Sequence, residues 1–126
     1  MRLLLDTHAL IWWLTDNPRL SGTARSAIRD PDNAVFASAV SGYEVANGQR
    51  LGKLAGGIAK DLPQALRGAR IPVHGLTMEH AIAAGLLPGP HRDPCDRLIM
   101  AQALGDGLTV VTADPVFRDY GLPVCW

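Results

Sequence analysis

Four acidic side chains stand where carboxylates could serve metal chemistry. They are Asp6, Glu44, Asp96 and Asp114. Asp6 directly follows an apolar run at residues 3–5, and Asp114 follows a second apolar run centred on Val110 and Val111. Carboxylates gathered without partner cations repel one another. Hard divalent cations such as Mg²⁺ or Mn²⁺ relieve that repulsion, because they prefer oxygen ligands.

The elements that must position these acids follow from the alternation of apolar runs and helical patterns. Short apolar runs predict strands at residues 3–5, 34–37, 71–74 and 108–112, with a short last strand at Val124. Helices are expected at residues 8–14, 21–29, 41–49, in part of 52–70, and at 77–85 and 94–104. This order predicts an α/β fold in a single domain over residues 1–126, with a central parallel sheet of about four or five strands and helices on both faces.

That fold would bring the acids together. In an open parallel sheet, the carboxyl ends of strands and the starts of the following helices share one edge. We therefore expect Asp6, Glu44 and Asp114 at that edge, joined by Asp96 if the loop before its helix returns there. Each acid also has an ordinary structural explanation. Asp6 and Asp93 can cap helices, Glu44 can complement a helix dipole, and Asp114 can form a turn.

Composition narrows the functional classes. With 48% hydrophobic and 19% charged residues, the chain is not disordered. Its apolar runs are too short to span a bilayer and no signal peptide is expected, so the cytoplasm is the expected compartment. Twelve Lys and Arg balance twelve Asp and Glu, so there is no global basic field for nucleic acid. Cys95 and Cys125 have no metal-binding spacing, so no zinc site is expected at them.

Five segments together resemble the PIN-domain ribonucleases, and within them the VapC-type toxins of bacterial toxin–antitoxin pairs. They are LLLDTHAL (3–10), SAVSGYE (38–44), GKL (52–54), HRDPCDRLIMAQA (91–103) and VVTAD (110–114). The resemblance extends from Leu3 to Trp126, and its most specific part is residues 91–98. Tyr43 and Cys95 depart from the family, which usually has Trp and a bulky apolar residue there. Neither departure removes an acid.

The resemblance implies a metal-dependent endoribonuclease with Mg²⁺ or Mn²⁺ as cofactor. Its metal ligands would be Asp6, Glu44, Asp96 and Asp114. Thr112 would be a polar support, and Asp93 either an assisting ligand or only a helix cap. A water activated by one or two ions would attack the scissile phosphorus and leave a 5′-phosphate and a 3′-hydroxyl. The target RNA, the number of ions and the choice between Mg²⁺ and Mn²⁺ stay open.

Basic residues and histidines near the acids supply candidates for substrate contact. Arg50, Lys53, Arg92 and Arg97 are candidates for binding RNA phosphates, or they form an ordinary solvated face. His8 and His91 flank the acids and could orient water or contact phosphate, or be structural. The resemblance also implies a homodimer held inactive by a cognate antitoxin, in a heterotetramer or larger assembly and without a membrane.

Other functions compete with this hypothesis. A haloacid-dehalogenase-like phosphatase would have a second Asp two residues after Asp6, where this chain has His8. A receiver-like module, or a PIN fold kept only for binding, shares the parallel sheet and the acid at the end of its first strand. A receiver does not predict acids at Glu44, Asp96 and Asp114 as well. A degenerate PIN fold usually lacks one of the four acids.

Overall fold

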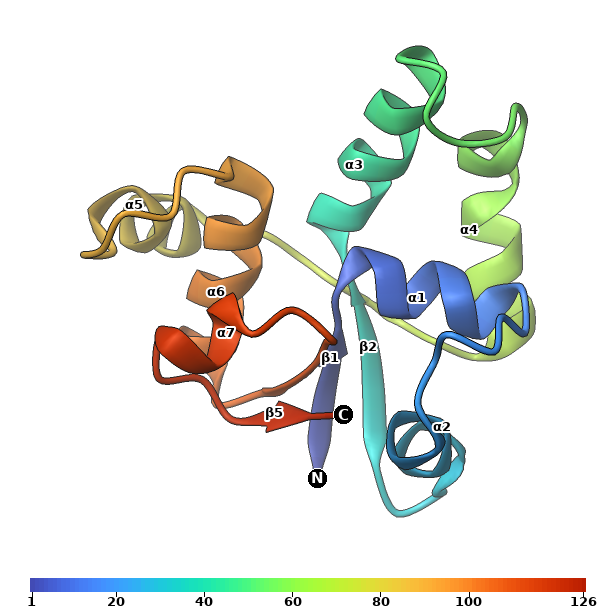
Figure 1. Ribbon diagram of the computed structural model, residues 1–126, viewed down its shortest axis with the longest axis horizontal. Coiled ribbons are helices and arrows are strands. Elements are labelled where there is room, and N and C mark those ends of the chain that lie inside the picture. The colour runs from blue at the N-terminus through green and yellow to red at the C-terminus, as the bar shows by residue number, and fades with distance from the viewer.

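A parallel sheet of five strands lies at the centre of the computed structural model, which describes residues 1–126 (Figure 1). The strands are β1 (Arg2–Leu5), β2 (Ala34–Ser38), β3 (Val73–His74), β4 (Thr109–Val111) and β5 (Val124–Cys125). Their order across the sheet is β3-β2-β1-β4-β5, and every neighbouring pair is parallel. The strands β2 and β3, which follow β1 in the chain, lie on one side of it, and the later strands β4 and β5 lie on the other. The strand order therefore reverses at β1. Open α/β sheets bind ligands at such a reversal point, beside the carboxyl ends of the strands.

Seven helices cover this sheet: α1 (Thr7–Leu14), α2 (Gly22–Arg29), α3 (Ala39–Arg50), α4 (Ile58–Ala69), α5 (Met78–Leu86), α6 (Pro94–Asp106) and α7 (Val116–Asp119). Figure 1 shows α1, α2 and α4 on one side of the sheet and α5, α6 and α7 on the other, with α3 rising from the end of β2. The predicted α/β architecture, with helices on both faces, is therefore confirmed. None of these helices is both long enough and apolar enough to cross a membrane.

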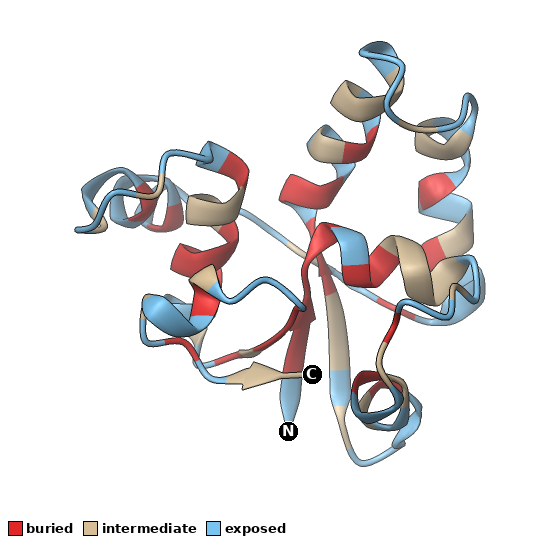
Figure 2. Ribbon diagram, viewed as in Figure 1, coloured by how far each residue is buried: buried red, intermediate tan, exposed pale blue.

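The central strand is apolar throughout because both of its faces are covered. Leu3 and Leu5 pack into a cluster with residues of α1, α2 and α4, whereas Leu4 packs into a second cluster with residues of α6 and α7. All three side chains are fully buried, and β1 is coloured as buried in Figure 2 except at its exposed first residue. Burying each such leucine contributes roughly 1.5–3 kcal/mol. This double-sided burial holds the end of β1, and with it Asp6, in a rigid frame.

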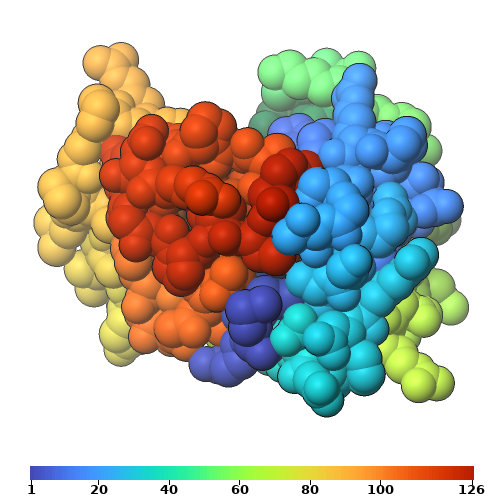
Figure 3. Space-filling model, turned by 60° about the horizontal axis from the view of Figure 1, so that its bottom comes forward, coloured from blue at the N-terminus to red at the C-terminus, as the bar shows by residue number.

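Both ends of the chain are tied to the sheet region, the N-terminal end in the central strand β1 and the C-terminal end in the edge strand β5. The terminal amino group of Met1 donates a hydrogen bond to Asn33 Oδ1 at 2.8 Å. At the other end, β5 packs against α2, and Trp126 packs against the cluster on that face. Figure 3 shows the C-terminal residues in red lying beside the blue segment that contains α2.

Element boundaries differ from the predictions in a few places. Helix α3 begins directly at the end of β2 because the Ser38 hydroxyl caps it, accepting a hydrogen bond from the Val40 N–H at 3.0 Å. Glu44 therefore lies in the second turn of α3 and not near its start. Pro63 lies inside α4, which continues past it with Leu66 buried. Helix α7 was not expected.

Candidate active site

Asp6 lies at the junction of β1 and α1 and is almost fully buried. One carboxylate oxygen caps α1 by accepting a hydrogen bond from the Ala9 N–H at 2.7 Å. The other oxygen accepts a hydrogen bond from the Thr112 hydroxyl. Thr112 follows β4, which pairs with β1 through Leu5 and Val111, so the sheet register brings the two side chains together. The Thr112 hydroxyl thus holds one oxygen of Asp6 in place.

Glu44 is held toward the same edge by the first residue of α1. The Thr7 hydroxyl lies 2.6 Å from Glu44 Oε1 and 2.8 Å from the Ser41 hydroxyl. Thr7 and Ser41 are both buried. These contacts join α1 to α3 and fix the carboxylate of Glu44. Thr7 and Ser41 were not singled out from the sequence, where only the position of Thr7 directly after Asp6 hints at a role.

The start of α6 carries two acids with different roles. The Asp93 carboxylate caps the helix, accepting hydrogen bonds from the N–H groups of Cys95 at 2.9 Å and Asp96 at 3.2 Å. Asp96 lies in the first turn, and its Oδ2 accepts a hydrogen bond from His91 Nε2 at 2.9 Å. Asp93 is therefore a cap, and Asp96 is held by a histidine.

Asp114 closes the turn after β4. Its backbone N–H donates to the Thr112 hydroxyl oxygen at 3.0 Å, and its Oδ1 accepts from the Val116 N–H at 3.0 Å. Thr112 therefore connects Asp114 to Asp6. The side chain of Asp114 is exposed, unlike that of Asp6.

Burial and mutual repulsion both raise the pKa values of three of these acids. Burial raises the pKa of Asp6, Glu44 and Asp96. The charge of Asp96 raises the pKa of both Asp6 and Glu44 further, and the charges of Asp93 and Asp114 raise the pKa of Asp96. No Lys or Arg forms an ion pair with any of these carboxylates. The site therefore carries excess negative charge that a cation would relieve.

The carboxylates surround this edge without meeting at one point. No three of them bring one oxygen each within 4.8 Å of one another. Of the four candidate ligands, Glu44 lines a cavity of about 480 Å³. Its walls include Thr7, His8, Tyr43, Glu44, Lys53 and Asp93. Lys53 thus shares a cavity with one of the acids.

The other predicted phosphate contacts have different surroundings. Arg97 is committed to the backbone: its guanidinium donates to the carbonyls of Ala84 at 3.1 Å and His91 at 3.0 Å, and also to that of Leu87. These bonds use three of the five N–H groups of the guanidinium and hold it against the backbone. A phosphate contact of Arg97 through the remaining N–H groups stays a prediction. Arg50 is exposed at the end of α3 and bonds to Asn47 Oδ1 at 2.5 Å, while Arg92 is exposed in the loop before α6.

A second polar cluster joins β3, α5 and α6 away from these acids. Asp106 Oδ2 lies 2.6 Å from His74 Nε2 and 2.8 Å from His80 Nε2. His80 Nδ1 accepts a hydrogen bond from the Thr77 N–H at 3.0 Å, so the ring proton of neutral His80 is on Nε2 and points at Asp106. A metal at Nε2 would need the lone pair that this proton occupies. The cluster is therefore a hydrogen-bonded clamp between elements.

Comparison with known proteins identifies the family to which this architecture belongs. A family model described as PIN domain matches residues 3–122. Ribonuclease VapC22 of Mycobacterium tuberculosis (strain ATCC 25618 / H37Rv) is 36% identical in an alignment 125 residues long, which covers 96% of this chain and 93% of that protein.

Solved structures share the fold at low sequence identity. VapBC2 from Rickettsia felis, bound to a promoter DNA fragment, aligns with a TM-score of 0.72 and 17% identity over 98% of this chain and 97% of that chain. DNA-bound VapBC from Salmonella typhimurium aligns with a TM-score of 0.71 and 19% identity, over 98% of this chain and 96% of that chain. The family match and the curated relative establish the assignment: the chain belongs to the PIN domain family, as a relative of the VapC ribonucleases.

Proposed function

We propose that this chain is a divalent-metal-dependent endoribonuclease that acts as the toxin of a toxin–antitoxin pair. The observation that carries the proposal is the group of carboxylates without partner cations at the reversal point of the sheet. The similarity to Ribonuclease VapC22 supports RNA as the substrate class.

The donor set fits Mg²⁺ or Mn²⁺. It consists of carboxylates alone, which suit hard cations, and contains no thiolate or imidazole cluster that would favour a softer metal. Asp6, Glu44, Asp96 and Asp114 would hold the metal. Once bound, a divalent ion neutralises charge on the phosphoryl oxygens and lowers the pKa of a coordinated water.

The chain's own residues perform the remaining tasks. The hydroxyls of Thr112 and Thr7 orient the carboxylates of Asp6 and Glu44 before any ligand arrives. These carboxylates also repel the phosphates of RNA, so the bare site disfavours substrate until a cation is present. Lys53 and Arg92, with Arg50 further along α3, would contact the flanking phosphates.

The partners follow from the same assignment. The structural neighbours from Rickettsia felis and Salmonella typhimurium are VapBC assemblies. We extend this to the present chain as a homodimer that binds a cognate antitoxin in the cytoplasm. An acidic site at the sheet edge would accept a basic side chain from such a partner, which would compete with the metal.

The test is cleavage of total cellular RNA by purified, antitoxin-free protein, with Mg²⁺, Mn²⁺ or EDTA, followed by mapping of the fragment ends. The proposal expects discrete fragments with 5′-phosphates that require the metal and disappear with Asp6→Asn. Folded protein that cleaves neither total RNA nor purified transfer, ribosomal and messenger RNA pools would contradict it and favour a non-catalytic binding module.

A further inference from the structure

We propose that His91 is the positioning residue for Asp96: its ring holds one carboxylate oxygen and leaves the other free to bind a metal. This inference rests on the proposed function and adds a residue to its site. The bond from His91 Nε2 to Asp96 Oδ2 is 2.9 Å long, and both side chains are partly buried. A ligand's partner of this kind fixes the orientation of the ligand and tunes its affinity for the metal.

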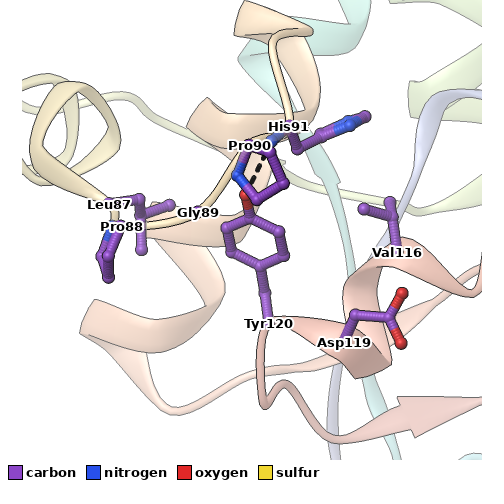
Figure 4. Close-up of a pocket in the computed structure, with 8 residues that line it drawn as sticks. All are labelled: Leu87, Pro88, Gly89, Pro90, His91, Val116, Asp119 and Tyr120. Carbon is purple, nitrogen blue, oxygen red and sulfur yellow. Dashed lines mark hydrogen bonds between the residues drawn. The ribbon is translucent and has the colours of Figure 1, made fainter.

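The backbone of His91 is fixed on both sides. Its N–H donates to the Tyr120 hydroxyl at 2.9 Å, shown as the dashed line in Figure 4. Its carbonyl accepts from Arg97 at 3.0 Å. Arg97 also binds the carbonyls of Ala84 and Leu87, so one guanidinium ties the end of α5 and the following loop to α6. These bonds fix the backbone from which the His91 ring projects toward Asp96.

The loop is shaped to admit Tyr120. Gly89 has a φ of +110°, and a Cβ there would lie 2.4 Å from the Tyr120 hydroxyl. Only glycine accepts both this backbone conformation and this close approach. The Tyr120 ring meets the His91 ring edge to face, with centroids 6.3 Å apart. Figure 4 shows Tyr120 rising from the end of α7 beneath the loop, so α7 and α6 together place His91.

The geometry predicts how Asp96 binds. Because Oδ2 accepts a hydrogen bond from His91 and Oδ1 accepts none, Asp96 would hold a metal through Oδ1. Without the ring, the carboxylate gains rotational freedom about its terminal torsion. This loss of a fixed orientation weakens metal binding without removing a ligand.

The experiment compares His91→Leu, which removes the donor, with His91→Gln, whose amide N–H can donate in its place. Calorimetry measures Mn²⁺ affinity, and cleavage assays on an RNA substrate give kcat and KM. Circular dichroism melts show whether each variant folds. We expect His91→Leu to weaken Mn²⁺ binding by roughly 10-fold or more and to lower kcat with little change in KM. His91→Gln should recover most of the affinity. Tyr120→Phe removes only the supporting hydroxyl, and should weaken Mn²⁺ binding less, by about 2- to 5-fold.

The outcomes separate the two proposals. Wild-type protein that binds no Mn²⁺ and cleaves no RNA overturns the proposed function. Wild-type protein that does both, with unchanged Mn²⁺ affinity in His91→Leu, overturns only the role of His91. A raised KM with unchanged Mn²⁺ affinity also overturns it, and makes His91 an RNA contact. If His91→Leu does not fold, Tyr120→Phe decides: unchanged Mn²⁺ affinity and kcat contradict the inference.

Discussion

At the scale of single residues, the site is a compromise between stability and chemistry. Asp6 is 8% exposed, caps a helix and accepts a threonine hydroxyl, and yet burial and the charge of Asp96 raise its pKa. Carboxylates kept where they repel one another lower the stability of the metal-free protein, a cost that functional sites commonly carry.

Asp6→Asn should expose this compromise. The variant keeps an oxygen for the Ala9 cap and removes the charge, so cleavage should fall by at least about 100-fold while stability in EDTA at pH 7 rises by roughly 0.5–1 kcal/mol. Because the pKa of Asp6 is raised on folding, its contribution to stability is present at low pH and lost as pH rises through that pKa. The advantage of the variant should therefore shrink as pH falls from 7 toward 4. Thermal melts in EDTA measure this, and a variant less stable than wild type at pH 7 would contradict it.

At the scale of elements, the hydrogen bonds at helix starts distinguish acids that cap a helix from acids that are candidate metal ligands. Asp93 caps α6 through two N–H groups, whereas Asp96, three residues on, is left facing the other acids. The sequence predicted the cap from Asp93-Pro94 and the convergence from the parallel-sheet rule. The sequence did not reveal that Arg97 would bind three carbonyls, because nothing local distinguishes such an arginine from a phosphate-binding one.

Substitution of Asp93 by serine and by alanine tests whether its carboxylate is more than a cap. Asp93→Ala should cost about 1 kcal/mol of stability through loss of the cap. Asp93→Ser keeps a capping oxygen without the charge, and should retain both near wild-type stability and most RNA cleavage. Urea unfolding and cleavage assays on the same preparations measure the two effects. A stable Asp93→Ser protein without cleavage would make Asp93 a metal ligand.

The hydrogen-bonded clamp between β3, α5 and α6 predicts that Asp106 affects stability with a pH dependence opposite to that of Asp6. Hydrogen bonds from His74 and His80 lower the pKa of Asp106. Its contribution to stability is therefore present above the ordinary pKa of 3.8 and lost as pH falls through the lowered value. Asp106→Asn should be less stable than wild type at pH 7 and at pH 5, and the difference should vanish in strong acid. Urea unfolding at several pH values measures this, and a difference that grows as pH falls below 3.8 would contradict it.

At the scale of the whole molecule, the pattern of apolar residues in the sequence was enough to predict most of the strands and the α/β fold class. The apolar runs at residues 3–5 and 108–112 predict buried strands, and they form the central strand β1 and its neighbour β4. The order β3-β2-β1-β4-β5 does not follow from pattern alone, since it depends on which faces and edges remain to be covered as the chain packs. Helix α7 is only four residues long and has no periodicity to read.

Metal binding should stabilise the whole domain, because only the folded chain brings the acids together. At a Mn²⁺ concentration of about 100 times Kd, the free energy of unfolding should rise by about 2.7 kcal/mol. Asp96→Asn should abolish most of this gain while leaving the EDTA melting temperature unchanged or higher. Calorimetric melts with and without Mn²⁺ measure it, and an equal gain in both proteins would place the metal elsewhere.

The most direct test of the central claim is the location of Mn²⁺ in crystals grown or soaked with the ion, from its anomalous scattering. We predict a peak among Asp6, Glu44, Asp96 and Asp114, with the Asp96 oxygen opposite His91 directed at it. A peak at His74, His80 and Asp106, or ordered crystals with no peak at the four acids in millimolar Mn²⁺, would contradict the assignment of these acids as the metal site.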